Sequence, residues 1–210
     1  MKRIAHLFFI LMLSFPLSAL PVTLGEVEFG LEGFDGYQEG MLYLSTDELG
    51  SMVELHIAYR GFGLDSVKWT FPAGDLEQLR LASASAAWWR SQLLSMDVTQ
   101  EVIRDTGTVT PSIEYTHGAE QWTLEPASHV LRFLRQGKDY ALILTEASPG
   151  ADTRKSGTKV LPVFTLHFQS TELPRLRDML TEDFVQQRID EYSTQKTAIE
   201  AILDSSAPAS

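Results

Sequence analysis

The sequence predicts an α+β protein with antiparallel sheets, helices on one face of them, and a further helix at the C-terminus. Several runs alternate apolar and polar residues, which is typical of strands with one buried face. Glycine-rich turns separate these runs. Two runs pass directly into segments whose leucines recur every three or four residues, as they do on one face of a helix. Runs of strands followed by helices indicate the α+β class.

Composition and charge limit the possible functions. The chain has 210 residues, of which 44% are hydrophobic and 21% are charged, as is typical of a folded globular protein. Its net charge is −11, so most of its surface would repel the phosphates of a nucleic acid. The chain has no cysteine, which excludes disulfides, cysteine-ligated metals and a thiol nucleophile.

Residues 1–19 have the layout of a secretory signal peptide. Lys2 and Arg3 give a basic start, an apolar segment follows, and Ala19 is the small residue before a cleavage site. The apolar segment is short for a membrane span, and Pro16 interrupts it. We therefore expect export to the periplasm or secretion, with an uncleaved N-terminal anchor as the alternative. No later segment approaches spanning length, so we expect no membrane span in the mature chain.

Residues 20–100 are predicted to form the first β-rich half, which ends in a helix. Its strands are expected at Val27–Leu31, Met41–Ser45, Val53–Arg60 and Val67–Phe71. The helix should begin at Gly74-Asp75 and end near Ser95. Neighbouring helical residues point about 100° apart, so we expect Trp89 in the core and Trp88 at its boundary.

Residues 101–204 are predicted to form the second β-rich half, which ends in helices. A hairpin should turn at His117-Gly118. Residues 205–210 form a small polar tail that we expect to be disordered. The remaining elements are strands at His129–Arg135, Tyr140–Thr145 and Val160–Phe168, then helices at Thr171–Leu180 and Thr181–Leu203.

One strand-to-helix joint occurs twice, at a constant offset of 97 residues. Asp75 of the first joint corresponds in kind to Glu172 of the second. The match allows the two halves to be duplicates. It is short, however, and the halves differ in their number of strands, so independent origins stay open. The identical residues are Phe71, Leu76, Leu79 and Arg80 in the first joint and Phe168, Leu173, Leu176 and Arg177 in the second.

Three aromatic residues are candidates for binding a partner. Phe34 and Tyr37 flank the expected turn at Asp35-Gly36, and aromatics at a loop tip can contact a ligand. Trp88 beside the core can anchor a protein or stack on a sugar. The alternative is structural, because such residues often fold back onto their own sheet.

A second set of candidates is polar. Glu54 and His56 lie two residues apart on one strand and therefore on one face, and His167 lies on the outward face of another strand. If the strands are close, the three could bind a divalent metal or act in a hydrolase. The alternative is a solvated sheet face.

The order of strands and helices is similar, in topology alone, to that of the Pur-alpha and Whirly single-stranded nucleic-acid binders. The chain matches none of their motifs, and its acidity and leader argue against nucleic acid as a partner. It also lacks a phosphate-binding loop, a nucleophile elbow and a zinc-protease helix. We therefore expect an exported, non-enzymatic binding or envelope-associated module, without cofactor or metal, whose partner is an envelope protein or a glycan.

Overall fold

The computed structural model describes most of the chain after the leader. Its first elements are four strands and a long helix: β1 (Val22–Leu31), β2 (Tyr37–Thr46), β3 (Met52–Arg60), β4 (Ser66–Pro72) and α2 (Ala73–Ser95). The described residues are 21–31, 37–46, 52–60, 66–96, 100–118, 120–124, 126–136, 139–146, 155–156, 159–160 and 165–205.

The second half begins with a strand that was not expected from the sequence. Its strands are β5 (Val102–Val109), β6 (Ser112–His117), β7 (Glu120–Leu124), β8 (His129–Gln136), β9 (Asp139–Glu146), β10 (Lys155–Ser156), β11 (Lys159–Val160) and β12 (Leu166–Gln169). Two helices follow, α3 (Leu173–Met179) and α4 (Glu182–Ser205). The protein is therefore α+β.

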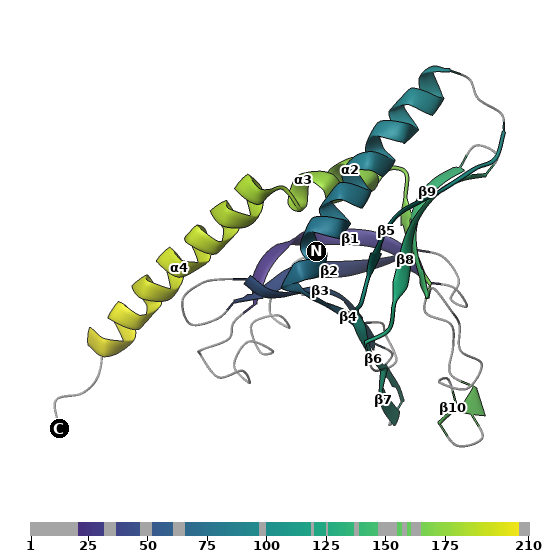
Figure 1. Ribbon diagram of the computed structural model, residues 1–210. Coiled ribbons are helices and arrows are strands. Elements are labelled where there is room, and N and C mark those ends of the chain that lie inside the picture. Colours follow the sequence, from purple (N-terminus) through teal and green to yellow (C-terminus); the bar gives the residue numbers. More distant parts are fainter. Residues whose placement is uncertain are drawn as a thin grey trace.

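All strands except β10 and β11 belong to one antiparallel sheet, in the order β5-β8-β9-β12-β1-β2-β3-β4-β6-β7. Thr110 and Pro111 connect β5, at one end of this order, to β6, near the other end. Because only two residues join these strands, the sheet must curl so that its two ends come close together. Figure 1 shows α2 lying across the sheet. The two expected halves share this one sheet.

Alternation along the strands gives the sheet a buried inner face and a polar outer face. On β2 and β3, Leu42, Leu44, Leu55 and Ile57 are buried, as the sequence predicts. The inner face packs against α2 and α3, whose buried residues join the same core. Its largest members, all almost completely buried, are Trp69, Phe29, Phe71, Phe133 and Phe168.

The two strand-to-helix joints make similar contacts. At the first, Oδ2 of Asp75 accepts a hydrogen bond from the backbone N–H of Thr110 at 2.6 Å, next to β6, the neighbour of β4. At the second, Oε2 of Glu172 accepts one from the backbone N–H of Glu28 at 3.4 Å, on β1, the neighbour of β12. Each carboxylate thus accepts a hydrogen bond from a backbone N–H beside the end of the strand that leads into its helix.

The first strands of the two halves also share an irregularity. The register of β1 shifts at Gly25 and that of β5 shifts at Gly107, 82 residues later. A side chain at Gly25 would meet Met179 on α3, and one at Gly107 would meet Gln78 on α2. Each bulge therefore lies against the helix of the other half.

Most expected elements are confirmed, and two are corrected. The expected helices at 75–95, 171–180 and 181–203 correspond to α2, α3 and α4. β5 was missed because its bulge at Gly107 breaks the alternation of the strand. The last strand was expected at Val160–Phe168, but β12 begins only at Leu166, and 161–164 lie outside the described residues. The expected tail is also outside them, apart from Ser205 at the end of α4.

Candidate functional site

On the outer face of the sheet, His56 on β3 lies between β2 and β4, whose facing residues carry hydroxyl groups. In the register of the sheet, His56 on β3 pairs with Tyr43 on β2 and with Thr70 on β4. Their inward neighbours are core residues, so these three side chains share the outer face. Only Glu54 and His56 of this group were identified from the sequence.

Each ring nitrogen of His56 has a hydroxyl partner. Nε2 lies 2.7 Å from Oγ of Ser45, and Nδ1 lies 3.0 Å from Oγ1 of Thr70. The Tyr43 ring stacks on the imidazole with ring centroids 4.6 Å apart and the planes inclined by 18°. Although His56 lies on the outer face, these contacts leave it only 5% exposed.

Burial makes His56 a weak base. Loss of solvent, reinforced by the positive charge of Lys68 and opposed by Glu114, lowers the pKa of His56 to about 4. The imidazole is therefore neutral at pH 7. Glu54 lies 3.5 Å from its Nε2, so this contact is not an ion pair at neutral pH.

The same environment acts on Tyr43. Burial, together with the carboxylates of Glu114 and Glu54, raises the pKa of Tyr43 to about 12. Lys68 and Glu114 form an ion pair at 2.8 Å beside this ring. These residues form one cluster that links β2, β3, β4 and β6 on the outer face of the sheet. Its members are Tyr43, Ser45, Glu54, His56, Lys68, Thr70 and Glu114.

His167 lies far from this cluster. It pairs with Gly30, which pairs with Tyr37 on β2, six residues from Tyr43. Six residues along a strand and three strands across a sheet correspond to a separation of roughly 25 Å in the plane of the sheet. The Glu54/His56/His167 site therefore does not assemble. Among the described residues, no group of three or more His, Asp or Glu side chains is placed to hold a metal ion.

The aromatic candidates of the first loop cannot be placed fully. Phe34 lies outside the described residues, and so does the side chain of Tyr37, whose backbone begins β2 opposite Gly30. Trp88, by contrast, lies on α2 and is 60% exposed. Its neighbour Trp89 is partly buried, with its ring 5.5 Å from that of Phe133.

Trp88 belongs to a face of α2 that points away from the core. Leu81 lies two turns before it, within about 20° around the helix axis, and is 47% exposed. The buried residues Leu79, Ala82 and Ala86 lie on the opposite side. We call this surface the outward face of α2, and it consists of Leu81, Ala84, Ser85, Trp88, Ser91, Gln92 and Ser95.

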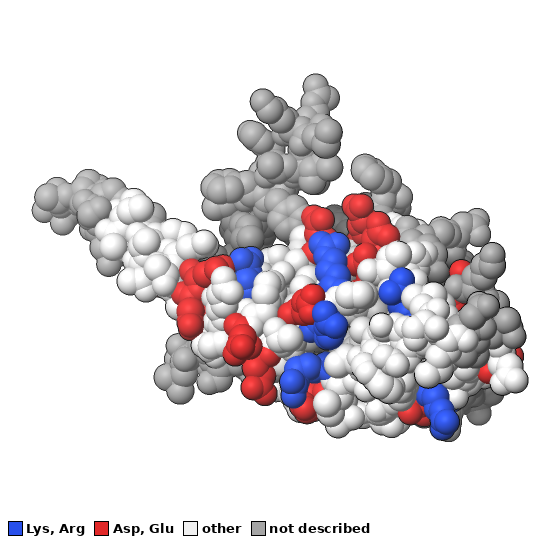
Figure 2. Space-filling view, turned by 90° about the horizontal axis from the view of Figure 1, so that it is seen from above, with Lys and Arg blue, Asp and Glu red and all other residues white. Residues whose placement is uncertain are grey.

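The outward face of α2 is unusual for a solvent-facing surface. Hydrophobicity is spread almost evenly around α2, so the solvent side is not markedly more polar than the side that packs on the core. The segment 81–89 has no charged residue, in a protein of net charge −11. Figure 2 shows a broad area with few charged residues on the right of the view, where Figure 1 places α2. This surface is the leading candidate for contact with a partner.

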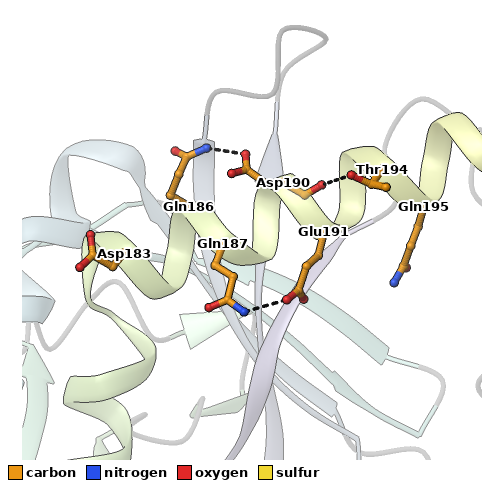
Figure 3. Close-up of a pocket in the computed structure, with 7 residues that line it drawn as sticks. All are labelled: Asp183, Gln186, Gln187, Asp190, Glu191, Thr194 and Gln195. Carbon is orange, nitrogen blue, oxygen red and sulfur yellow. Dashed lines mark hydrogen bonds between the residues drawn. The ribbon is translucent and has the colours of Figure 1, made fainter.

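A shallow hollow follows a polar strip of α4. Within it, Nε2 of Gln186 bonds Asp190 and Nε2 of Gln187 bonds Glu191, both at 2.8 Å, one helical turn apart (Figure 3). These bonds stabilise the helix itself. All seven lining residues come from this one helix, so the hollow does not enclose a ligand: Asp183, Gln186, Gln187, Asp190, Glu191, Thr194 and Gln195.

Comparison with known proteins gives no relative: no protein-family model matches this sequence, and no curated protein or solved structure matches it either. Among the described residues, no helix combines the length and apolar character that crossing a membrane requires.

Proposed function

We propose that this protein is an exported, non-enzymatic binding module that contacts a partner protein through the outward face of α2. The observation that carries the proposal is the exposure of Trp88 and Leu81 on one side of α2, within a segment, 81–89, that has no charged residue. Exposed tryptophans on apolar surfaces are typical anchors of protein interfaces. Export is inferred from the leader, and cleavage after Ala19 predicts a mature N-terminus at Leu20, which N-terminal sequencing of the host protein tests.

A protein fits this surface better than a glycan. Ser85, Ser91 and Gln92 flank Trp88 with polar groups, but Leu81 and Ala84 extend the apolar surface by two helical turns, which a single sugar ring on Trp88 would leave uncovered. Their burial under a partner would supply the affinity. The outward face therefore favours an apolar protein surface, such as another helix.

Photo-crosslinking in the host tests this proposal. A photoreactive phenylalanine analogue at position 88 should form covalent adducts with a protein after irradiation, because the partner would lie directly on this side chain. The matched control carries the analogue at the exposed Gln121 on β7, where we expect no adduct. Equal yields at both positions, or no protein adduct at position 88, would count against the proposal.

A hydrolase is the second candidate, and one observation favours it. Oγ of Ser45 lies 2.7 Å from Nε2 of His56, which is the separation of a nucleophile and its base. Against it, Nδ1 of His56 meets the hydroxyl of Thr70 where a triad has a carboxylate. A serine-reactive phosphonate that labels the wild type but not Ser45→Ala would support this candidate, and absence of labelling would remove it.

We also propose that the two halves are duplicates. The corresponding bulges at Gly25 and Gly107 and the corresponding carboxylates of Asp75 and Glu172 support this. Two hairpins of the second half, β6–β7 and β10–β11, account for the unequal strand counts, because β5, β8, β9 and β12 then correspond to β1, β2, β3 and β4. An experimental structure should contain one two-fold rotation that superposes both the bulges and the joints. Superposition of the joints alone would favour independent origins.

A further inference from the structure

Three arginines share the inner face of the sheet beneath the second half of α2. Arg104 on β5 pairs with Phe133 on β8, and Arg135 is two residues further along β8, so both arginines lie on the face of Phe133. Arg90 lies on the side of α2 that carries its buried residues. The ring of Trp89 lies 5.5 Å from that of Phe133, so this part of α2 covers the same region of the sheet. We call the surface formed by Arg90, Arg104 and Arg135 the arginine corner.

Arg135 carries a buried charge with no opposite charge beside it among the described residues. The side chain belongs to a residue that is only 5% exposed. Its hydrogen bonds go to neutral groups, from Nε to the hydroxyl of Tyr140 at 3.2 Å and from Nη1 to the backbone carbonyl of Gln100. Glu101 and Asp139 each precede a residue that pairs with Arg135, so both acids lie on the outer face. A buried guanidinium is costly unless an anion accompanies it.

The other two arginines also have no carboxylate partner among the described residues. Nε of Arg90 is buried and has no hydrogen-bond partner there. Arg104 is exposed at the edge of the sheet, and no described acid forms an ion pair with it. Residues 78–96 of α2 contain no acid. The arginine corner is therefore positively charged in a protein whose net charge is −11.

Aromatic rings surround the arginine corner. The rings of Phe133 and Tyr140 are 6.2 Å apart, and the guanidinium of Arg135 lies 5.7 Å from the centre of the Tyr140 ring. Trp89 adds a third ring from α2. Gln100, which bonds Arg135 through its backbone, is exposed, so solvent comes close to the guanidinium. Apolar walls beside a cation favour an anion with an apolar body.

The guanidinium of Arg135 keeps donors for such an anion. Of its five N–H groups, the hydroxyl of Tyr140 accepts from the one on Nε, and the carbonyl of Gln100 accepts from one of the two on Nη1. The remaining N–H groups have no acceptor among the described residues. Guanidinium groups form short, charge-assisted hydrogen bonds with the oxygens of carboxylates and phosphates.

The first half of the chain has no arginine at the corresponding position. The glycine bulges pair with Leu42 on β2 and with Leu131 on β8. Four residues further along each strand, β2 has Thr46 and β8 has Arg135. The proposed duplicates therefore form the same strand with and without this charge, so the fold itself does not require a buried arginine here.

We propose that the arginine corner binds the anionic head of a small ligand whose body is apolar. The head, a carboxylate or a phosphate, bonds the free donors of Arg135 and supplies the missing opposite charge. Arg90 and Arg104 attract the same head, and the aromatic rings cover the apolar body. This site lies on the other side of α2 from the outward face, so the inference goes beyond the proposed function and does not depend on it.

Calorimetric titration of the chain from residue 20 to 210 tests the site with three probes that share a phenyl ring. Benzoate and phenyl phosphate carry the two heads, and benzamide is the neutral control. We expect at least one anion to bind with a dissociation constant of about 1 mM or lower, and the tighter one identifies the head. Benzamide should bind at least tenfold more weakly. Failure of both anions to bind at about 10 mM, or equal binding of benzamide, would overturn the proposal.

Substitutions test the assignment to these residues. Arg135→Gln should weaken anion binding at least tenfold, and Arg104→Gln roughly threefold. Arg104 is exposed, so its replacement should preserve the fold, and circular dichroism verifies both variants. Arg132→Gln is the matched control, because Arg132 lies on the outer face of β8, where it pairs with Asp105. Unchanged binding in a folded variant of either corner arginine, or an equal loss in Arg132→Gln, would overturn the proposal.

Discussion

Replacement of His56 by glutamine should remove a specific part of the pH dependence of stability. In the folded protein the pKa of His56 is lowered from 6.5 to about 4 by burial and by Lys68. In the unfolded chain the same group titrates near its ordinary value. Between these two values the unfolded state binds more protons, so stability is complete above pH 6.5 and is lost as pH falls toward 4.

The size of the effect follows from the two pKa values. At pH 5 the unfolded His56 is almost fully protonated and the folded one is mostly neutral, which lowers the free energy of unfolding by about 2 kcal/mol relative to pH 7.5. Glutamine can still donate to one hydroxyl and accept from the other, but it does not titrate. His56→Gln should therefore lose about 2 kcal/mol less than the wild type between pH 7.5 and pH 5.

Urea unfolding followed by tryptophan fluorescence at both pH values measures this difference. His56→Gln is also expected to be less stable at pH 7.5, by about 1 to 2 kcal/mol, because its hydrogen bonds to Ser45 and Thr70 are less well placed. Tyr43→Phe is the control, since it keeps the ring that buries His56 and should keep the wild-type pH dependence. Equal pH dependence in His56→Gln and the wild type would refute the assignment of a buried, neutral imidazole.

Two further substitutions test the packing of the fold. Gly40→Ala should lower the free energy of unfolding by about 1 to 3 kcal/mol, because the new Cβ would lie 2.9 Å from the carbonyl of Ala58. In Gly74→Ala the new Cβ meets no atom within 4 Å, so stability should be unchanged or rise by up to about 1 kcal/mol. Thermal denaturation compares the two, and similar losses in both would contradict the packing argument. Asp75→Asn should lose about 1 to 2 kcal/mol in urea, because its carboxylate accepts from both the N–H and the hydroxyl of Thr110, and an unchanged midpoint would show that this joint contributes nothing.

The sequence was sufficient to predict the helices and to predict which face of most strands is buried. The leucine spacing defined α2, and the alternation at Leu55 and Ile57 correctly indicated the buried face of β3. It could not show β5, because the bulge at Gly107 interrupts the alternation on which strand prediction depends. The sequence also did not show that the bulges correspond to each other, because they are 82 residues apart whereas the two joints are 97 residues apart.

The candidate site could likewise be predicted from the sequence only in part. Adjacent helical positions were enough to predict that Trp89 is the more buried of the two, although Trp88, expected at the boundary of the core, is 60% exposed and Trp89 is only partly buried. The partners of His56 depend on which residues of neighbouring strands lie abreast, and that register is set by turns and bulges across the sheet. For the same reason the sequence could not show that His167 lies far from Glu54.

Cysteine labelling of the outward face of α2 tests most directly whether another protein covers this surface after export. Ser91→Cys places a single thiol on that face, and Thr123→Cys places one on the exposed surface of β7. In host cells, a maleimide that cannot cross the cytoplasmic membrane should label Thr123→Cys readily and Ser91→Cys at least tenfold more slowly, whereas dilute purified proteins should react at similar rates. Equal labelling of both variants in cells would contradict a covered outward face, and labelling of neither before lysis would contradict export.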